Sequence, residues 1–324
     1  MQATQKITRA MELIAASQIA RAQARIAANH PYRAGLQRAV AEVLAESSPD
    51  GDDATAGALQ TAAVIVIAGD RGLSGAYNSS VLRATERLLD EQRAAGIESM
   101  LVTVGRKARS YFRFRGRPLA RFFEGMADRP SFSDARTVAA VVWDAFAAGE
   151  VQQVSVVSTR FFSAGRQAVE VRQLLPLRGS SDATGSGMRD RPAHLERTDV
   201  GAGGGEAARP TQTELVAAPP ATPGATGGAP AARLGYTEFE PDSAQLLATL
   251  APQVLESELF SAMLEASASE HAARQRAMAA ATENADELIR TLSRIMNRAR
   301  QDAITTEIME IVGGAEALRA ARRT

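Results

Sequence analysis

Residues 62–70 are Ala-Ala-Val-Ile-Val-Ile-Ala-Gly-Asp, an unbroken apolar run that ends in a turn. A run of this length, closed by glycine and aspartate, is typical of a strand buried on both faces of a sheet. A second run of the same kind occupies residues 99–104 and is closed by Gly105. Between the two, residues 79–95 carry apolar side chains at helical spacing. This stretch therefore predicts a strand, a helix and a second strand.

The same alternation continues further along the chain. A helix is predicted at residues 135–148, and strands are predicted at residues 151–159 and 168–177. Strands that alternate with helices favour a parallel-type sheet flanked by helices. The predicted fold class is α/β, with a small Rossmann-like domain over residues 58–177.

The turn after the first strand is Gly69-Asp-Arg-Gly-Leu-Ser-Gly75, and it precedes a predicted helix. This is the context of a phosphate-binding turn, but the turn contains no Gly-Lys-Ser/Thr and does not fit G-x-G-x-x-G. A tight, close-packed turn is therefore favoured. A nucleotide-dependent enzyme built on this domain would also need an acid, base or nucleophile nearby, and the sequence shows none with useful specificity.

The region before the domain, residues 1–48, has the pattern of one long amphipathic helix. It contains no glycine before Gly35, and its apolar residues recur at steps of three to five between basic ones. Pro31 is expected to kink or divide this helix, because proline removes a hydrogen bond and crowds the preceding turn.

The region after the domain, residues 242–320, has the pattern of a second and longer helix. After Pro252 it contains no further proline, and no glycine occurs before the Gly313-Gly314 pair. That pair is expected to end or loosen the helix. If residues 253–318 are helical, the rise of ~1.5 Å per residue gives a rod of about 100 Å.

Apolar or small side chains of this second helix step by alternating threes and fours, which is the heptad seam of a coiled coil. The members of the seam are Met278, Ala281, Ala285, Leu288, Leu292, Ile295 and Ala299. The seam then shifts phase to Ile304, Ile308, Ile311 and Ala315. A domain this small cannot bury both helices along their whole length. We therefore expect the two to pack on each other as an antiparallel coiled coil and to protrude.

Residues 178–234 have a different composition, dominated by Gly, Ser, Ala, Pro and Thr. Such a segment has too little apolar surface to offset the entropy cost of ordering it, so we expect a disordered insert. Residues 235–241 are expected to form the last strand of the α/β domain.

Composition excludes several classes of protein. The 37 basic and 37 acidic residues cancel, so the global charge favours neither nucleic acid nor an anionic membrane. The chain has no cysteine, which excludes disulfides and thiolate chemistry. Its apolar runs are far shorter than the ~18 residues of a transmembrane helix. His30, His194 and His271 lack metal-ligand spacing, and we assign no metal, cofactor or catalytic role to them.

Three blocks of sequence closely resemble the gamma chain of F-type ATP synthases. They are Gln-Lys-Ile-Thr-Arg-Ala-Met-Glu-Leu-Ile-Ala-Ala-Ser at residues 5–17, Asp-Arg-Gly-Leu-Ser-Gly-Ala-Tyr-Asn at residues 70–78, and Asn-Arg-Ala-Arg-Gln-Asp-Ala-Ile-Thr-Thr-Glu-Ile-Met-Glu-Ile-Val-Gly-Gly-Ala at residues 297–315. The blocks occur in the family's order, and with the helix, domain, helix plan they cover everything except residues 178–234.

The resemblance implies a mechanical, non-catalytic role. In the family, the coiled coil lies in the cavity of a ring of three alpha and three beta subunits, and the globular domain lies on the membrane-embedded c-ring with the epsilon subunit. Proton flow turns ring and shaft together, which couples ion transport to ATP synthesis. The resemblance thus implies a single-copy, peripheral protein at the cytoplasmic face of a bacterial plasma membrane, and a role in regulating ATPase activity.

The resemblance also implies two groups of contact residues. Arg300, Gln301 and Thr305 match the positions that hydrogen-bond a beta-subunit loop as a catch. Lys6, Arg9 and Met11 match the coupling contact with an acidic beta-subunit lever. From the residues alone, the first group is equally an exposed helix face, and Met11 is equally a seam residue.

Two departures from the family pattern concern the start and the insert. Family members usually begin with a further short helical stretch, so we expect either a start upstream of Met1 or a shortened coupling end. The family also joins its last strands by a much shorter loop than residues 178–234. A coiled-coil scaffold or adaptor remains the alternative function, but it leaves the α/β domain and the three blocks unexplained.

Overall fold

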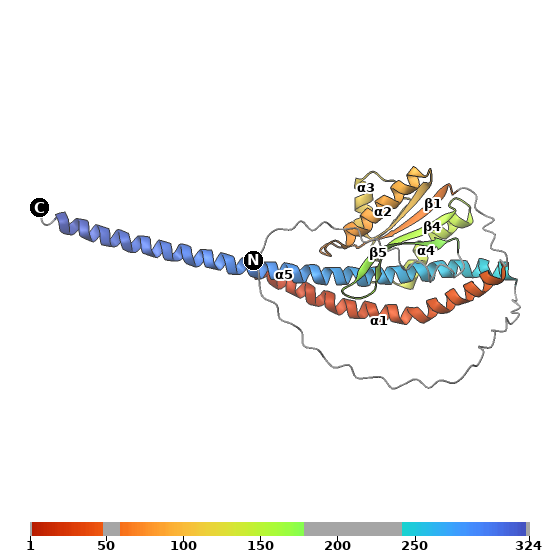
Figure 1. Ribbon diagram of the computed structural model, residues 1–324, viewed down its shortest axis with the longest axis horizontal. Helices are drawn as coiled ribbons and strands as arrows, with labels where there is room; N and C mark the ends of the chain where they lie inside the picture. Colours follow the sequence, from red (N-terminus) through yellow and green to blue (C-terminus); the bar gives the residue numbers. More distant parts are fainter. Residues whose placement is uncertain (1, 48–58, 178–241, 322–324) are drawn as a thin grey trace, which may run out of the picture. The chain divides into compact units, whose positions relative to one another are not determined.

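The computed structural model describes residues 2–47, 59–177 and 242–321 (Figure 1). These residues all belong to one compact unit of the chain. The expected insert at residues 178–234 and the expected strand at residues 235–241 lie outside the described residues.

A five-stranded sheet forms the centre of the α/β domain. Its strands are β1 (Thr61–Ile67), β2 (Glu98–Val104), β3 (Arg121–Phe123), β4 (Gln153–Phe161) and β5 (Gln167–Leu175). Their order across the sheet is β3-β2-β1-β4-β5, and the first four are parallel. This order confirms the Rossmann-like α/β fold class.

The prediction of a parallel-type sheet is wrong for its last strand. β5 pairs with β4 antiparallel, in a register that joins Phe161 to Gln167. Only five residues separate the two strands, and a parallel neighbour would need a crossover of a dozen or more residues. The short connection therefore forces a hairpin.

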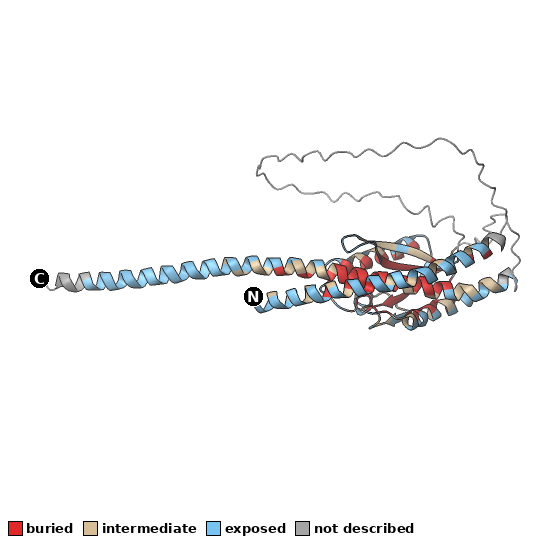
Figure 2. Ribbon diagram, turned by 90° about the horizontal axis from the view of Figure 1, so that it is seen from below, coloured by how far each residue is buried: buried red, intermediate tan, exposed pale blue. Residues whose placement is uncertain are grey.

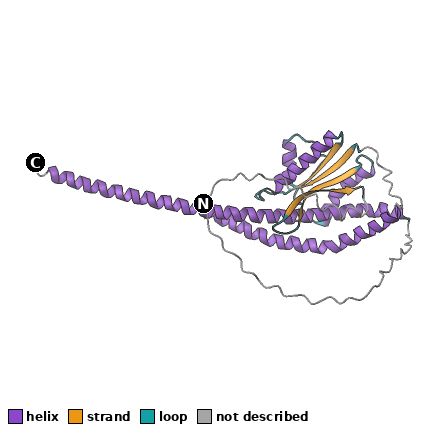
Figure 3. Ribbon diagram, in the orientation of Figure 1, coloured by secondary structure: helices purple, strands orange, loops and turns teal. Residues whose placement is uncertain are grey.

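Helices cover both faces of the sheet (Figure 3). They are α2 (Tyr77–Ala94), α3 (Arg106–Phe114) and α4 (Phe132–Ala147). Alternate residues of β1 point to opposite faces: Ile65 packs in a core with α4 and the C-terminal helix, whereas Val66 packs in a core with α2 and α3. α4 begins with a capping box in which Ser131 and Asp134 exchange hydrogen bonds.

The two terminal helices pack against each other in opposite directions, as expected. They are α1 (Gln2–Ser47) and α5 (Ser243–Ala321). Thr282 Oγ1 donates to Thr8 Oγ1 at 2.8 Å near one end of the pair, and Arg33 lies 2.6 Å from Glu258 near the other. None of the described helices is long and apolar enough to cross a membrane.

Proline and glycine interrupt these helices less than expected. Pro31 does not divide α1, which continues as one curved helix (Figure 1). α5 contains Pro252 within its 79 residues and continues through the Gly313-Gly314 pair, so the expectation that this pair ends the helix is wrong. A helix of that length spans about 118 Å.

The burial of α5 changes along its length (Figure 2). Its middle part is enclosed by α1 and the α/β domain, whereas every residue from Leu292 to Ala315 is exposed. Because α1 begins at Gln2, which lies beside Leu292 and Met296, the last part of the heptad seam has no partner within the described residues.

Candidate functional site

The three expected catch residues lie on the exposed C-terminal part of α5. Arg300, Gln301 and Thr305 are all exposed. Thr305 Oγ1 donates to the Gln301 carbonyl at 2.9 Å, and this is a bond within the helix. Within the described part of the chain, the side chains of Arg300 and Gln301 form no hydrogen bond or ion pair, so their polar groups face solvent.

The expected coupling residues lie elsewhere, near the start of α1. Lys6 and Arg9 are exposed, and Met11 is half-buried. Arg9 forms an ion pair with Glu12 on its own helix, at 3.0 Å. Thr8 marks the level of this group on α5, because it pairs with Thr282. The catch begins 18 residues further along α5, which is roughly 27 Å at the helical rise. The structure therefore keeps the two groups apart.

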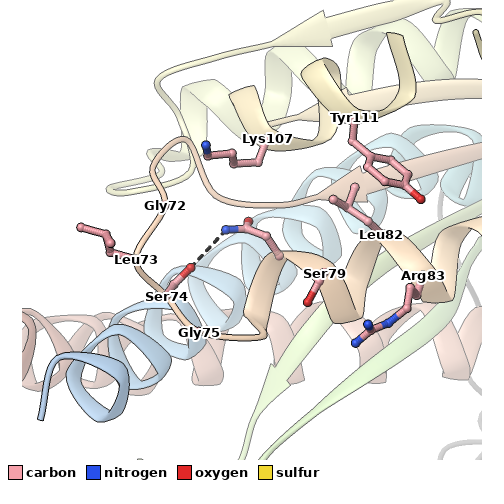
Figure 4. A pocket seen from close by; sticks show the side chains of 10 residues that line it. Gly72, Leu73, Ser74, Gly75, Ser79, Leu82, Arg83, Lys107 and Tyr111 are labelled. Atoms are coloured by element: carbon pink, nitrogen blue, oxygen red, sulfur yellow. Dashed lines mark hydrogen bonds between the residues drawn. The ribbon is translucent and has the colours of Figure 1, made fainter. Parts of the chain in front are cut away.

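The turn after β1 is tightly braced by two side chains of its own motif. Gly69 N–H donates to Asn78 Oδ1 at 2.8 Å, and Asn78 Nδ2 donates to Ser74 Oγ at 3.1 Å (Figure 4). Asp70 accepts hydrogen bonds from the backbone N–H groups of Arg106 and Gly125, both at 3.0 Å. These polar side chains are used for the fold, which accounts for their place in the motif without a bound phosphate.

A cavity of about 550 Å³ lies between this turn, α2 and α3 (Figure 4). It is lined mainly by apolar atoms, with the cationic side chains of Lys107 and Arg83 at its sides. Leu73 at its rim is 61% exposed and has a φ of 64°, a left-handed conformation that is uncommon outside glycine. The remaining lining residues are Gly72, Ser74, Gly75, Asn78, Ser79, Leu82 and Tyr111.

A buried charged cluster behind the turn was not predicted from the sequence. Glu270 and Arg274 form an ion pair of 2.5 Å inside α5, with the carboxylate against Gly69. Burial raises the pKa of Glu270, although Arg274 opposes the effect. Burial, followed by the nearby Glu270 carboxylate, also raises the pKa of Tyr77. The spacing of four residues between an acid and a base on one helix face was the available signal.

His271 lies in the same cluster and is 3% exposed. Its Nε2 is 3.8 Å from Asp128 Oδ1, and Arg274 lies on its other side. Burial lowers the pKa of His271, against the opposing effect of Asp128. Of the other histidines, His30 is exposed and His194 lies outside the described residues.

The lowered pKa of His271 predicts a loss of stability in acid. The folded state disfavours the protonated imidazole, so stability is full above the ordinary pKa of histidine and falls as pH drops below it, from about pH 7 to pH 5. Thermal unfolding of the full chain should therefore show a smaller difference between pH 8 and pH 5.5 in His271→Gln than in the parent. Equal differences in the two proteins would contradict this assignment.

Comparisons with known proteins match nearly the whole chain. The family model described as ATP synthase matches residues 1–318. The ATP synthase gamma chain of a Parafrankia species is 42% identical over 323 residues, which cover 98% of this chain and 94% of that protein. The ATP synthase gamma chain of Kineococcus radiotolerans is also 42% identical over 323 residues, covering 98% and 93%.

Solved structures agree with the fold. A chain in the structure of the central stalk and c-ring of Tetrahymena thermophila mitochondrial ATP synthase superposes with a TM-score of 0.57 and 22% identity. The match covers 85% of this chain and 99% of that one. The family model and the relatives, which span both helices and the domain, lead to one conclusion: the chain belongs to the ATP synthase family, as one of its gamma chains.

Proposed function

We propose that this chain is the central rotor shaft of a proton-driven ATP synthase and carries no active site of its own. Its partners are a ring of three alpha and three beta subunits, an epsilon subunit and a c-ring, with one copy of the chain in each complex. The c-ring holds it at the cytoplasmic face of the bacterial plasma membrane, as a peripheral protein. Catalysis belongs to the beta subunits, whose ATP synthesis and hydrolysis the shaft drives and regulates.

The observation that carries this proposal is the uncovered end of α5. Between Leu292 and Ala315 the helix has no buried residue, yet it presents large apolar side chains. These are Leu292, Ile295, Met296, Ile304, Ile308, Met309, Ile311 and Val312, each between 46% and 67% exposed. A row of exposed apolar side chains of this kind marks a surface that a partner covers. A hollow ring would enclose the helix on all sides.

A shaft of this kind acts through asymmetry. One face of α5 carries the apolar row together with Arg300 and Gln301, whereas the opposite face carries Asp302, Thr306 and Glu310, so three surrounding subunits would each meet a different surface. A ligand shifts a protein between two conformations because it binds one of them more tightly than the other. In the same way, the surface of the shaft that faces a given subunit favours one conformation of that subunit, and rotation brings a different surface to each subunit in turn. Lys6, Arg9 and Met11 serve as the coupling contact with an acidic lever lower on the shaft.

The catch assignment predicts a loss of turnover without a loss of folding. The triple variant Arg300→Ala, Gln301→Ala, Thr305→Val changes only exposed side chains, so the unfolding free energy of the chain should stay within about 0.5 kcal/mol. The hydrolysis rate of the assembled complex should fall about tenfold, equivalent to one or two lost hydrogen bonds to a partner.

The matched control for this variant is Thr306→Val. Thr306 makes the same bond within the helix as Thr305, from Oγ1 to the carbonyl four residues earlier at 2.9 Å, but on another face. We expect full activity from this control. An active triple variant would remove the catch assignment.

The alternative function, a coiled-coil scaffold, is distinguished from the shaft by the complex that the chain forms. The chain is co-expressed with the alpha and beta subunits of its own organism, and the mass of the intact purified complex is measured. The shaft proposal expects one copy per three alpha and three beta subunits. A stable homo-oligomer that does not bind the ring would favour the scaffold instead.

A further inference from the structure

The middle of α5 is enclosed on every side. Twelve consecutive residues, from Ser261 to Ala272, are all buried (Figure 2). A helix at a protein surface normally buries one stripe, so this stretch is held in a socket made by α1, α4 and the sheet. The enclosed stretch is also unusually polar for a core. Its buried polar residues are Ser261, Glu265, Ser267, Ser269, Glu270 and His271.

The first anchor of this stretch is a charged network that joins three elements. Glu258 of α5 accepts hydrogen bonds from Arg33 of α1, at 2.6 and 2.9 Å, and from Arg172 of β5, at 3.1 Å. Arg33 also donates to Ser261 Oγ at 3.2 Å, and Glu265 lies within 3.9 Å of both arginines. Burial lowers the pKa of Arg172, but the neighbouring glutamates outweigh burial and raise it overall, so the guanidinium stays charged.

The second anchor joins α5 to loops at the carboxyl ends of the strands. Ser267 Oγ donates to the Asp128 carbonyl at 2.7 Å. Ser269 Oγ donates to the Thr159 carbonyl of β4 at 3.3 Å, but it lies eleven residues from Glu258 and therefore on the side of the first anchor. Arg274 reaches the Gly72 carbonyl at 3.5 Å while it pairs with Glu270. The turn after β1 is thereby tied to the helix.

The two anchors lie on opposite sides of the helix. Glu258 and Ser267 are nine residues apart, which is about two and a half turns at 3.6 residues per turn. Bonds that leave a rod in opposite directions resist its rotation about its own axis. Apolar packing is non-directional, so alone it fixes the rotation of α5 relative to the α/β domain less firmly. Hydrogen bonds fix this rotation more firmly, because their strength depends steeply on geometry.

We propose that residues 258–274 of α5 are the torque joint of this chain, where the two opposed anchors fix the angle between the α/β domain and the shaft. The proposal rests on the rotor function and names where torque passes from the domain to α5. Arg33, Arg172 and Glu258 hold one side, and Ser267 and Arg274 hold the other. These are positioning residues that set torsional stiffness.

The test measures that stiffness in the complete complex. A probe is attached to the α/β domain while the stalled alpha and beta ring holds the end of α5, and the angular spread of the probe is recorded. The test variant replaces the charged network with methionine throughout: Arg33→Met, Arg172→Met, Glu258→Met and Glu265→Met. Replacing a whole buried ion network by apolar side chains of similar size is often neutral for folding.

The angular variance of this variant should rise about twofold, because the variant removes roughly half of the hydrogen bonds and ion pairs that hold α5 in the joint. A second variant, Ser267→Ala, removes a bond from the other side with little change in packing, and its variance should rise as well. The control is Arg136→Met with Glu256→Met, which removes an ion pair of 3.3 Å outside the joint, whose arginine side chain is 64% exposed. Its variance should match that of the parent.

A disulfide across the joint provides the rescue. A Cβ built at Gly75 lies 3.6 Å from the Cβ of Ala277, which is within disulfide range, and the chain has no other cysteine. Gly75→Cys with Ala277→Cys is introduced into the methionine variant and compared with its own reduced form, because φ at residue 75 is 55° and strains any side chain. Oxidation should return the variance to the parent value.

The outcomes separate this inference from the rotor proposal. If the parent chain does not assemble with the ring, the proposed function fails. If the parent assembles but both test variants keep its angular variance, the joint is wrong and the rotor proposal stands. The joint proposal would also be wrong if the angular variance of the control rose as much as that of the test variants. It would be wrong as well if oxidation of the disulfide left the angular variance unchanged.

Discussion

Replacing Gly105 with alanine is expected to destabilise the α/β domain by more than about 4 kcal/mol. Gly105 ends β2 with a φ of 100°, a region that side-chain-bearing residues essentially avoid. A Cβ at this position would lie 2.0 Å from the carbonyl oxygen of Ala68, so the backbone of β1 would have to move. Since a domain of this size has ~5–15 kcal/mol of stability in total, little folded protein should remain.

The control for this substitution is Gly96→Ala. Gly96 also has a positive φ, of 75°, but nothing lies within 4 Å of a Cβ built there. We expect a cost of only about 1–2 kcal/mol from the backbone conformation. Urea unfolding of both full-length variants measures the difference, and equal midpoints would show that close approach of β1 and β2 is not the cause.

Removing the cation of the buried pair in α5 should have the second-largest effect. Arg274→Met leaves Glu270, which is 2% exposed, without its partner, and breaking a buried ion pair in this way costs about 3–5 kcal/mol. The double variant Glu270→Leu, Arg274→Met leaves no buried charge and should recover most of that stability. Arg294→Met is the control, because Arg294 is exposed and, among the described residues, donates only to Thr291 on its own helix.

The loss of folding stability in Arg274→Met should depend on pH. Burial already raises the pKa of Glu270, and removing Arg274 raises it further. A carboxyl group whose pKa is higher in the folded state contributes most below its unfolded pKa, and this contribution is lost as pH rises through the folded value. Unfolding measured at pH 5 and pH 8 should therefore show the larger deficit at pH 8. A deficit independent of pH would mean that the carboxylate is not the cause.

The sequence was sufficient to predict the α/β domain between two long helices. The buried strands are continuous apolar runs, and the terminal helices contain few residues that break a helix. α3 and β3 were missed because they have nine and three residues, which is too short for a periodic signal. β3 is also mostly exposed, so its residues lack the apolar character of the inner strands.

Helix ends and interruptions were harder to predict than helices. Pro31, Pro252 and the Gly313-Gly314 pair all lie inside continuous helices. Local preferences cost a few kcal/mol at most, and the tertiary packing of α1 and α5 overrides the first two. The glycine pair lies on the exposed part of α5, and we have no packing reason for its helical conformation.

The contact residues were placed by family resemblance, and geometry adds what the sequence alone could not give. Arg300, Gln301 and Thr305 are far from Lys6, Arg9 and Met11 along the shaft, and their roles stay predictions. The buried network of Glu258, Arg33 and Arg172 joins residues separated by more than 80 positions, which no local pattern reveals. Such contacts depend on how the helices pack against the sheet.

The central claim is that this chain rotates as a shaft, and rotation can be observed directly. The chain is assembled with the alpha and beta subunits of its own organism, the ring is fixed to a surface, and a probe is attached to the α/β domain. ATP should turn the probe continuously in one direction, in three steps per revolution if each beta subunit acts in turn. A probe that stays still while the complex hydrolyses ATP would contradict the account.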